Sequence, residues 1–146
     1  MKAMKLPRAL LATAAVCVAL GAGTAHAAKI VVTIDGLHSA KGDLYVALFS
    51  RADEFPDGDH SDQHVKLKAS LAPITVTFDA LRGRYAVGAY HDENANGKLD
   101  TNFIGYPTEG YALSNGIRAV VSRPRFTDAA FLVGEGATKV ALHIKY

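Results

Sequence analysis

The sequence predicts an all-β protein: a single antiparallel β-sandwich of about seven strands, with immunoglobulin-like or transthyretin-like topology. Short segments in which apolar and polar residues alternate recur along the chain, and residues that favour turns separate them at short intervals. After residue 27, no stretch has the apolar periodicity of a helix. Many short strands are typical of sandwiches, so we expect one hydrophobic core between two sheets.

Seven segments carry the strand pattern. They are residues 29–35, 43–50, 65–71, 74–78, 85–91, 128–133 and 138–146. In the first segment, Ile30, Val32 and Ile34 share one face and should lie in the core. The second segment is apolar on both faces, which predicts a strand covered on both sides. The third and fourth flank Pro73 and should pair with each other as an antiparallel hairpin.

The start of the fifth segment has the pattern of a tyrosine corner. Leu81, Gly83 and Tyr85 place a leucine, a turn glycine and a tyrosine in the required order. In immunoglobulin-like sandwiches the phenol of such a tyrosine hydrogen-bonds to nearby backbone and fixes the crossover. We expect this arrangement at Tyr85, with a plain hairpin as the alternative.

The first 27 residues are predicted to be a cleaved signal peptide rather than part of the fold. Three basic residues precede an apolar run at residues 10–20, which is too short to span a bilayer. Ala25-His26-Ala27 supplies the small residues of a cleavage site, so we expect cleavage after Ala27. Residues 28–146 would then form the single sandwich domain, in the periplasm or secreted.

The composition that remains after cleavage excludes several classes of function. The leader contains three of the sixteen basic residues and the only cysteine, Cys17. Thirteen basic and fourteen acidic residues remain, a formal charge of −1, so nucleic acid is not an expected partner. The expected domain has no cysteine for disulfides or thiolate metal sites. No later segment is long and apolar enough to cross a membrane.

One loop carries most of the potential chemistry. Oxygen-bearing side chains occupy positions one, three, five and nine of a calcium-loop template that begins at Asp92, and Gly97 occupies position six. Calcium prefers six to eight oxygen ligands, so the loop predicts a calcium site. The candidate ligands are Asp92, Asn94, Asn96, the carbonyl of Lys98, Asp100 and, from a later turn, Glu109.

The calcium template is incomplete at its end. Position twelve, where a bidentate glutamate should close the coordination sphere, is Phe103, and Glu109 would have to replace that ligand. The alternative is a turn without metal, because Asn and Gly tolerate positive φ and Asn side chains cap turns without an ion. Residues 103–126 that follow have no regular pattern, which predicts a long functional or mobile loop.

Two alternative functions involve other residues. A hydrolase site could lie between residues 92–109 and the acidic loop that contains His60 and His64, if a concave pocket joins them. A carbohydrate or envelope polymer could bind through exposed aromatic rings, for which the candidates are Phe103, Tyr106 and Tyr111.

The expected function is non-enzymatic. The sequence has no serine elbow, no His-Glu-x-x-His motif and no phosphate loop, so we assign no catalytic residue. We expect a binding or structural module of the cell envelope whose partner is an envelope protein, a polymer or a small ligand.

Several runs of the chain resemble one bacterial family. These are VALF at 46–49, LRGRYAV at 81–87, HDENANGKLDTNFIGYPTEGY at 91–111, SN at 114–115 and PRFTDAAF at 124–131. Together they are similar to the family called domain of unknown function 2141. The resemblance implies an exported, single-domain, β-rich protein whose biochemical role is uncharacterised. It also implies that the loop at 92–100 and the turn at 107–110 belong together, and it supplies no catalytic residues.

Overall fold

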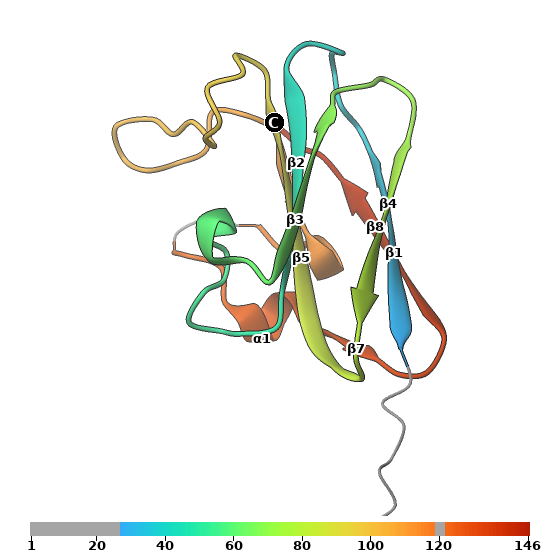
Figure 1. Cartoon of the computed structure of the whole chain (residues 1–146). Coiled ribbons are helices and arrows are strands. Elements are labelled where there is room, and N and C mark those ends of the chain that lie inside the picture. Colours follow the sequence, from blue (N-terminus) through green and yellow to red (C-terminus); the bar gives the residue numbers. More distant parts are fainter. Residues whose placement is uncertain (1–26, 119–121) are drawn as a thin grey trace, which may run out of the picture.

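The computed structural model describes residues 27–118 and 122–146, in which two β-sheets pack face to face (Figure 1). One sheet has the strand order β4-β1-β8, and the other has the order β3-β2-β5-β6, with β7 pairing to β5. The strands are β1 (Ala28–Asp35), β2 (Asp43–Phe49), β3 (Gln63–Lys68), β4 (Ile74–Ala80), β5 (Gly83–Asp92), β6 (Tyr111–Leu113), β7 (Phe131–Val133) and β8 (Ala137–His143). The predicted all-β sandwich is confirmed, with eight strands rather than seven.

The main core lies between the two sheets and follows the predicted alternation. Ile30, Val32 and Ile34 of β1 are fully buried, and Leu44, Val46 and Leu48 of β2 join them in one cluster. Burying one such side chain contributes roughly 1.5–3 kcal/mol. The residues between them are less buried, so the period of two in the sequence is the period of burial in β1.

A second hydrophobic cluster lies on the outer face of the five-stranded sheet. Its buried members are Phe49, Phe55, Ala86, Tyr111, Leu113 and Ala129. The segment 51–60 and the short helix α1 (Phe126–Ala129) cover part of this face (Figure 1). The prediction that β2 is covered on both sides is therefore confirmed at Phe49, while Tyr45 and Ala47 on the same outer face are only partly buried.

Two predictions about strand partners are wrong. The third and fourth segments do not form a hairpin: β3 pairs with β2 in one sheet, and β4 pairs with β1 in the other. Alternation tells which face of a strand is apolar, but it does not tell which sheet the strand joins. The tyrosine corner is also not formed. The hydroxyl of Tyr85 donates no hydrogen bond to the described backbone, and the residue pairs with Phe131 of β7 and packs on the main core.

The region after residue 103 contains more regular structure than predicted. It includes β6, which was missed because its three residues are all buried and show no alternation. Residues 128–133 were expected to be one strand, but α1 continues to Ala129 and only Phe131–Val133 is extended. Asp128 lies in the first turn of α1 and pairs with Arg125 at 3.0 Å, which favours the helical turn.

The predicted signal peptide falls almost wholly outside the described residues, which include only Ala27 of it. Cleavage after Ala27 stays a prediction. Among residues 27–118 and 122–146, no helix has the length and apolar character needed to cross a bilayer.

Gly42 fixes the distance between the start of β2 and the end of β5. It has φ of +72°, and a Cβ there would overlap the backbone carbonyl oxygen of Asp92. We expect Gly42→Ala to lower the free energy of unfolding by roughly 3 kcal/mol or more, measured by urea unfolding, because left-handed strain and a backbone clash add together.

The control is Gly136→Ala. Gly136 has φ of +81° and open space around its Cβ position, so this change should cost about 1–2 kcal/mol from backbone strain alone. An equal loss of unfolding free energy in the two variants would show that the close approach of Gly42 to the carbonyl of Asp92 does not limit the residue at position 42.

Candidate functional site

The loop after β5 is held by side-chain oxygens that accept hydrogen bonds from its own backbone. Asp92 is fully buried, and its two carboxylate oxygens accept the N–H groups of Asn96 at 3.0 Å and Gly97 at 2.7 Å. Asn94 Oδ1 accepts from Asn96 N–H at 3.0 Å, and Asn96 Oδ1 accepts from Lys98 N–H at 2.9 Å. The contacts of Asn94 and Asn96 are successive Asx turns, and Asp92 closes the loop over a longer span.

Glu109 joins the two ends of this loop. Its side chain is nearly buried, with Oε1 accepting from the N–H of Glu93 at 3.0 Å and Oε2 accepting from the N–H of Asp100 at 3.0 Å. A charged acceptor with two backbone donors is stronger than a neutral one. Glu109 therefore folds back to the loop as the sequence suggested, and there it binds backbone N–H groups.

The predicted calcium ligands are close together, but most of their oxygens already accept hydrogen bonds. Asp100 accepts the amide N–H groups of Asn94 at 2.6 Å and Asn96 at 2.9 Å. Within the described part of the chain, no three His, Cys, Asp or Glu side chains are grouped so that they could hold a metal ion. A calcium ion would need both asparagine amides to turn their oxygens toward Asp100, at the cost of the Asx turns. Calcium binding stays a prediction.

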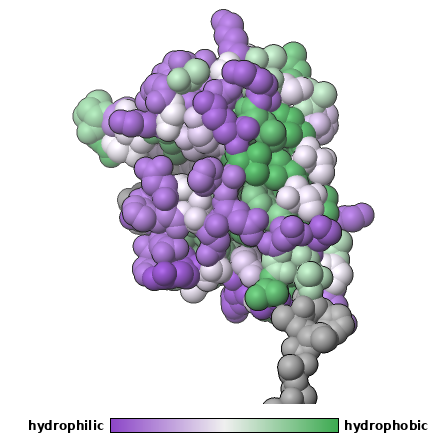
Figure 2. Space-filling view, viewed as in Figure 1, coloured by the Kyte–Doolittle hydropathy of each residue, from purple (hydrophilic) through white to green (hydrophobic). Residues whose placement is uncertain are grey.

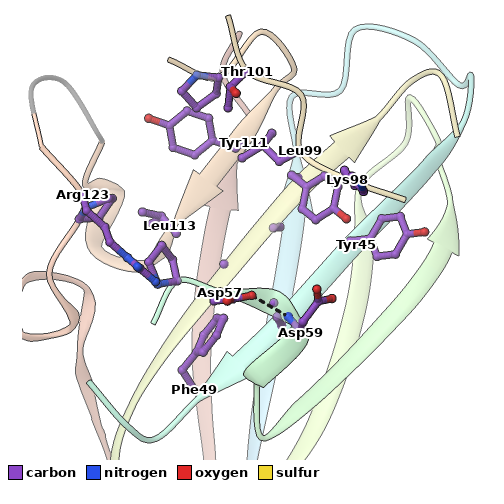
Figure 3. Close-up of a pocket in the computed structure, with 18 of the residues that line it drawn as sticks. Tyr45, Phe49, Asp57, Asp59, Lys98, Leu99, Thr101, Tyr111, Leu113 and Arg123 are labelled. Carbon is purple, nitrogen blue, oxygen red and sulfur yellow. Dashed lines mark hydrogen bonds between the residues drawn. The ribbon is translucent and has the colours of Figure 1, made fainter. Parts of the chain in front are cut away.

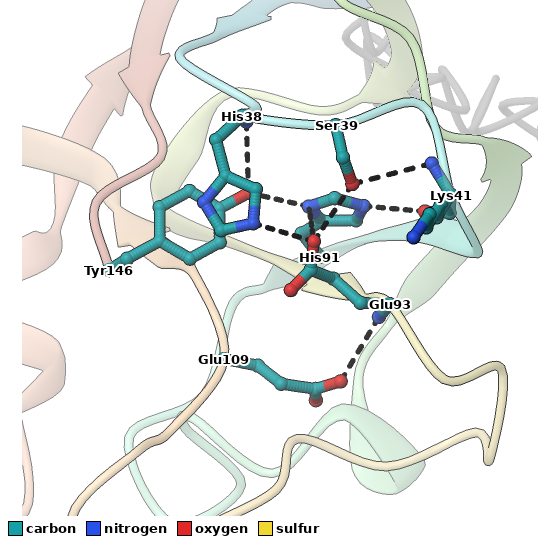
Figure 4. Close-up of polar contacts among 7 residues, drawn as sticks. All are labelled: His38, Ser39, Lys41, His91, Glu93, Glu109 and Tyr146. Atoms are coloured by element: carbon teal, nitrogen blue, oxygen red, sulfur yellow. Dashed lines mark hydrogen bonds and ion pairs between the residues drawn. The ribbon is translucent and has the colours of Figure 1, made fainter.

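A second polar cluster surrounds His91, which is fully buried (Figure 4). His91 Nε2 lies 2.7 Å from the carbonyl oxygen of Lys41, which can only accept, so this nitrogen carries a proton. His91 Nδ1 lies 2.5 Å from the hydroxyl of Tyr146. Tyr146 also stacks on His38, with ring centroids 3.6 Å apart. The cluster joins the loop between β1 and β2 to the end of β5.

Glu93 completes this polar cluster. Its Oε1 accepts from Ser39 Oγ at 2.8 Å and lies 2.6 Å from His38 Nε2. Burial works to raise the pKa of Glu93, but the hydrogen bonds from Ser39 and His38 outweigh it and the pKa is lowered. Burial raises the pKa of Tyr146, so its hydroxyl stays protonated beside His91 Nδ1.

The cluster around His91 does not have the geometry of a nucleophile and its base. The Ser39 hydroxyl donates to Glu93 rather than to an imidazole, and both nitrogens of His91 are hydrogen-bonded. Its observed role is to connect three segments of the chain.

A groove of about 910 Å³ lies on the outer face of the five-stranded sheet (Figure 3). Its floor follows from the strand register. Ala47 of β2 lies opposite Gly88 of β5, so two very small residues meet in the middle of the sheet. On one side of them, Tyr45 and Tyr90 are also opposite each other, and their rings stack with centroids 4.8 Å apart. On the other side stands Phe49. Small residues between aromatic ones leave a trough across the strands.

Two loops form the walls of this groove. One wall is the predicted calcium loop and its continuation, from Gly97 to Pro107, which the hydroxyl of Tyr90 holds through a hydrogen bond to Gly97 O at 3.3 Å. The opposite wall comes from residues 56–59 and 122–124. Charged side chains occupy the walls: Asp57, Asp59, Lys98 and Arg123. Burial raises the pKa of Tyr90, whose phenol therefore stays neutral as a hydrogen-bond donor.

The chain matches one family model, described as "Uncharacterized protein conserved in bacteria (DUF2141)", over residues 32–141. The chain belongs to this family. The resemblance seen in the sequence is thus confirmed, and its match covers both the loop after β5 and the groove. No curated protein and no solved structure gives a significant match.

The residues of the two alternative functions are only partly brought together. The groove lies where the hydrolase alternative required it, between the loop after β5 and the acidic loop, and His64 lines it. His60 instead pairs with Asp57 at 3.0 Å and is exposed. Of the aromatic rings suggested for carbohydrate, Phe103 and Tyr106 are exposed, and Tyr106 lines the groove. Tyr111 also lines the groove, but it is buried in the second cluster, so the prediction that its ring is exposed is wrong.

The sequence suggested where a pocket would have to lie, but it did not predict the floor of the groove. The sequence showed that β2 is apolar on its outer face, and Gly88 interrupts the strand that became β5. The missing information was the register that places Ala47 against Gly88.

We expect Glu109→Gln to lower the free energy of unfolding by about 1–3 kcal/mol, because a glutamine has one acceptor oxygen and leaves the N–H of Glu93 or Asp100 without its partner. Urea unfolding at pH 7 measures this loss. The control, Glu135→Gln, removes the charge of an exposed carboxylate that pairs with Arg82, and should change stability by less than about 0.5 kcal/mol. Similar losses in both variants would contradict the proposed role of Glu109.

Proposed function

We propose that this protein is an exported, non-enzymatic binding module of the cell envelope and that it binds a small amphipathic ligand in the groove. The observation that supports the proposal is the trough above Ala47 and Gly88, flanked by aromatic rings and walled by two loops. Ligand sites in proteins are typically concave, mostly apolar and equipped with a few polar groups, with volumes of about 300–1,000 Å³.

The lining of the groove favours a ligand with a flat or cyclic apolar body. Tyr45 and Tyr90 offer ring faces and edges at the floor, and Leu99 adds aliphatic surface. Phe49 and Leu113 also line the floor, but they are almost fully buried and expose little surface to a ligand. The charges lie higher, on the walls, where they meet the polar part of such a ligand. Cations and carboxylates are both present, so the walls suit hydroxyl-bearing, zwitterionic or anionic groups.

Binding is favoured over hydrolysis because the one cluster that combines a serine hydroxyl with histidines and a carboxylate within the described residues lies outside the groove. The described cluster that contains a serine, two histidines and a glutamate lies around His91 and contributes no residue to the lining of the groove. In the groove, His64 stands opposite Ala47 on a neighbouring strand, as part of the floor.

We expect the protein to bind 1-anilinonaphthalene-8-sulfonate, an amphipathic aromatic anion, saturably under native conditions. Ala47→Leu should weaken this binding at least tenfold, because the added carbons fill the centre of the trough. Fluorescence titration measures the affinity, and urea unfolding confirms that the variant is folded. Ala141→Leu, an exposed position on β8 outside the groove, is the matched control. Unchanged affinity in Ala47→Leu would contradict the proposal.

Calcium binding by the loop after β5 is a second part of the proposed function. Its support is the spacing of the oxygens from Asp92 to Asp100, together with a fold in which Glu109 reaches the same loop. The loop forms one wall of the groove, so an ion that orders it would also shape the groove.

We expect excess calcium to raise the melting temperature relative to a chelator, because an ion that binds the native state alone stabilises it by mass action. Asp100→Asn should abolish this rise, since it removes one of the two carboxylates of the template while keeping a side chain of the same size. Asp79→Asn, an exposed carboxylate paired with Lys29 on β1, is the control and should retain the rise. If calcium and chelator give the same melting temperature in the unaltered protein, the loop does not bind this ion.

A further inference from the structure

The loop after β5 ends in a tip with two large apolar side chains that are strongly exposed, of which Ile104 also lines the edge of the groove. Phe103 is 98% exposed and Ile104 is 73% exposed. The segment that carries them projects away from the sandwich (Figure 1), and hydrophobic surface gathers at its outer end (Figure 2). The other strongly exposed large aliphatic residues, Leu71, Leu81 and Leu132, are not adjacent in sequence. Single apolar residues are common on protein surfaces and need no explanation. Two adjacent ones at the end of a projection indicate an interaction site.

The tip is a defined turn. Asn102 Oδ1 accepts the N–H groups of Ile104 at 3.1 Å and Tyr106 at 3.0 Å. Asn102 N–H donates to Tyr106 O at 2.8 Å, and Gly105 N–H donates to Asn102 O at 2.9 Å. These bonds hold the backbone so that the side chains of Phe103 and Ile104 face outward. They also satisfy the N–H groups of residues 104–106 within the tip.

We propose that this tip docks on a lipid bilayer, with Phe103 and Ile104 entering the interface between headgroups and acyl chains. The interface between headgroups and acyl chains holds water for the remaining backbone groups, and the N–H groups of residues 104–106 are already satisfied within the tip, which lowers the cost of shallow insertion. Residues 101–107 carry no charge. Tyr106, 40% exposed, has the amphipathic ring that is enriched at the membrane interface.

A bilayer fits the tip better than a protein pocket because of the shape of the projection. The outer end of the loop can reach a flat surface without the sandwich following it (Figure 1). The expected net charge of −1 gives no general attraction to anionic lipid, so the contact is hydrophobic and should be insensitive to salt. Two side chains give weak, reversible docking, since even a myristoyl chain binds with about 10⁴ M⁻¹.

The absence of tryptophan from the sequence allows a direct test. Phe103→Trp introduces a single indole at the tip, and Leu132→Trp introduces one on β7, at a position that is 73% exposed. The protein, purified after export, is titrated with phosphatidylcholine vesicles at up to millimolar lipid. We expect a blue shift of the tryptophan emission in Phe103→Trp and no shift in Leu132→Trp.

Two further arms make the outcome specific to hydrophobic docking. The blue shift should persist in 0.5 M NaCl and be the same when a fifth of the lipid is phosphatidylglycerol. Adding Ile104→Ser to Phe103→Trp should lower the partition coefficient several-fold, while urea unfolding shows unchanged stability because the residue is exposed.

Three results would overturn the proposal. They are no shift with vesicles, a shift that salt abolishes, or a shift that follows protein concentration without lipid, which would assign the tip to a protein surface such as a second copy. Dye binding in the groove does not enter this test, so the two proposals can fail separately.

Discussion

Buried carboxylates that accept backbone N–H groups are the constraint on which the irregular half of this molecule depends. Asp92 and Glu109 between them accept four backbone N–H groups, those of Asn96, Gly97, Glu93 and Asp100. No sheet ladder pairs these N–H groups, and leaving one of them unpaired where water cannot reach it would cost about 1–3 kcal/mol. The carboxylates replace the missing ladder, and the loop gains a fixed shape at the end of a rigid strand.

The fixed shape of the loop has one consequence on the side that faces the sandwich and another at its outer end. Toward the sandwich, the segment forms a wall of the groove, because Gly97 is hydrogen-bonded to Tyr90. Away from the sandwich, it continues to the turn at Asn102, which presents Phe103 and Ile104. The same arrangement of acceptors therefore positions both the concave and the convex features that we assign to binding.

The sequence predicted which face of each strand is buried, but it did not predict which strands pair with each other. The alternation of Ile30, Val32 and Ile34 identified the core side of β1, since each residue reports its own burial. Partnership between strands depends on residues far away in the chain, so neither the place of β3 nor the meeting of Ala47 with Gly88 could be read locally. The loop after β5 lies between these cases: its turn chemistry and the return of Glu109 were expected, but the donors that Glu109 binds were not.

The parallel pairing of β1 with β8 has a consequence for how this chain acquires its structure. Lys29 pairs with Ala137 and Asp35 pairs with His143, so the central strand of the three-stranded sheet receives a neighbour from near the opposite end of the sequence. Contacts between such distant segments slow folding, because the entropy of closing a long loop must be paid before the contacts form. The three-stranded sheet cannot be completed until the residues of β8 are available. Late closure of this kind suits translocation of an unfolded chain, the route that the predicted signal peptide would require.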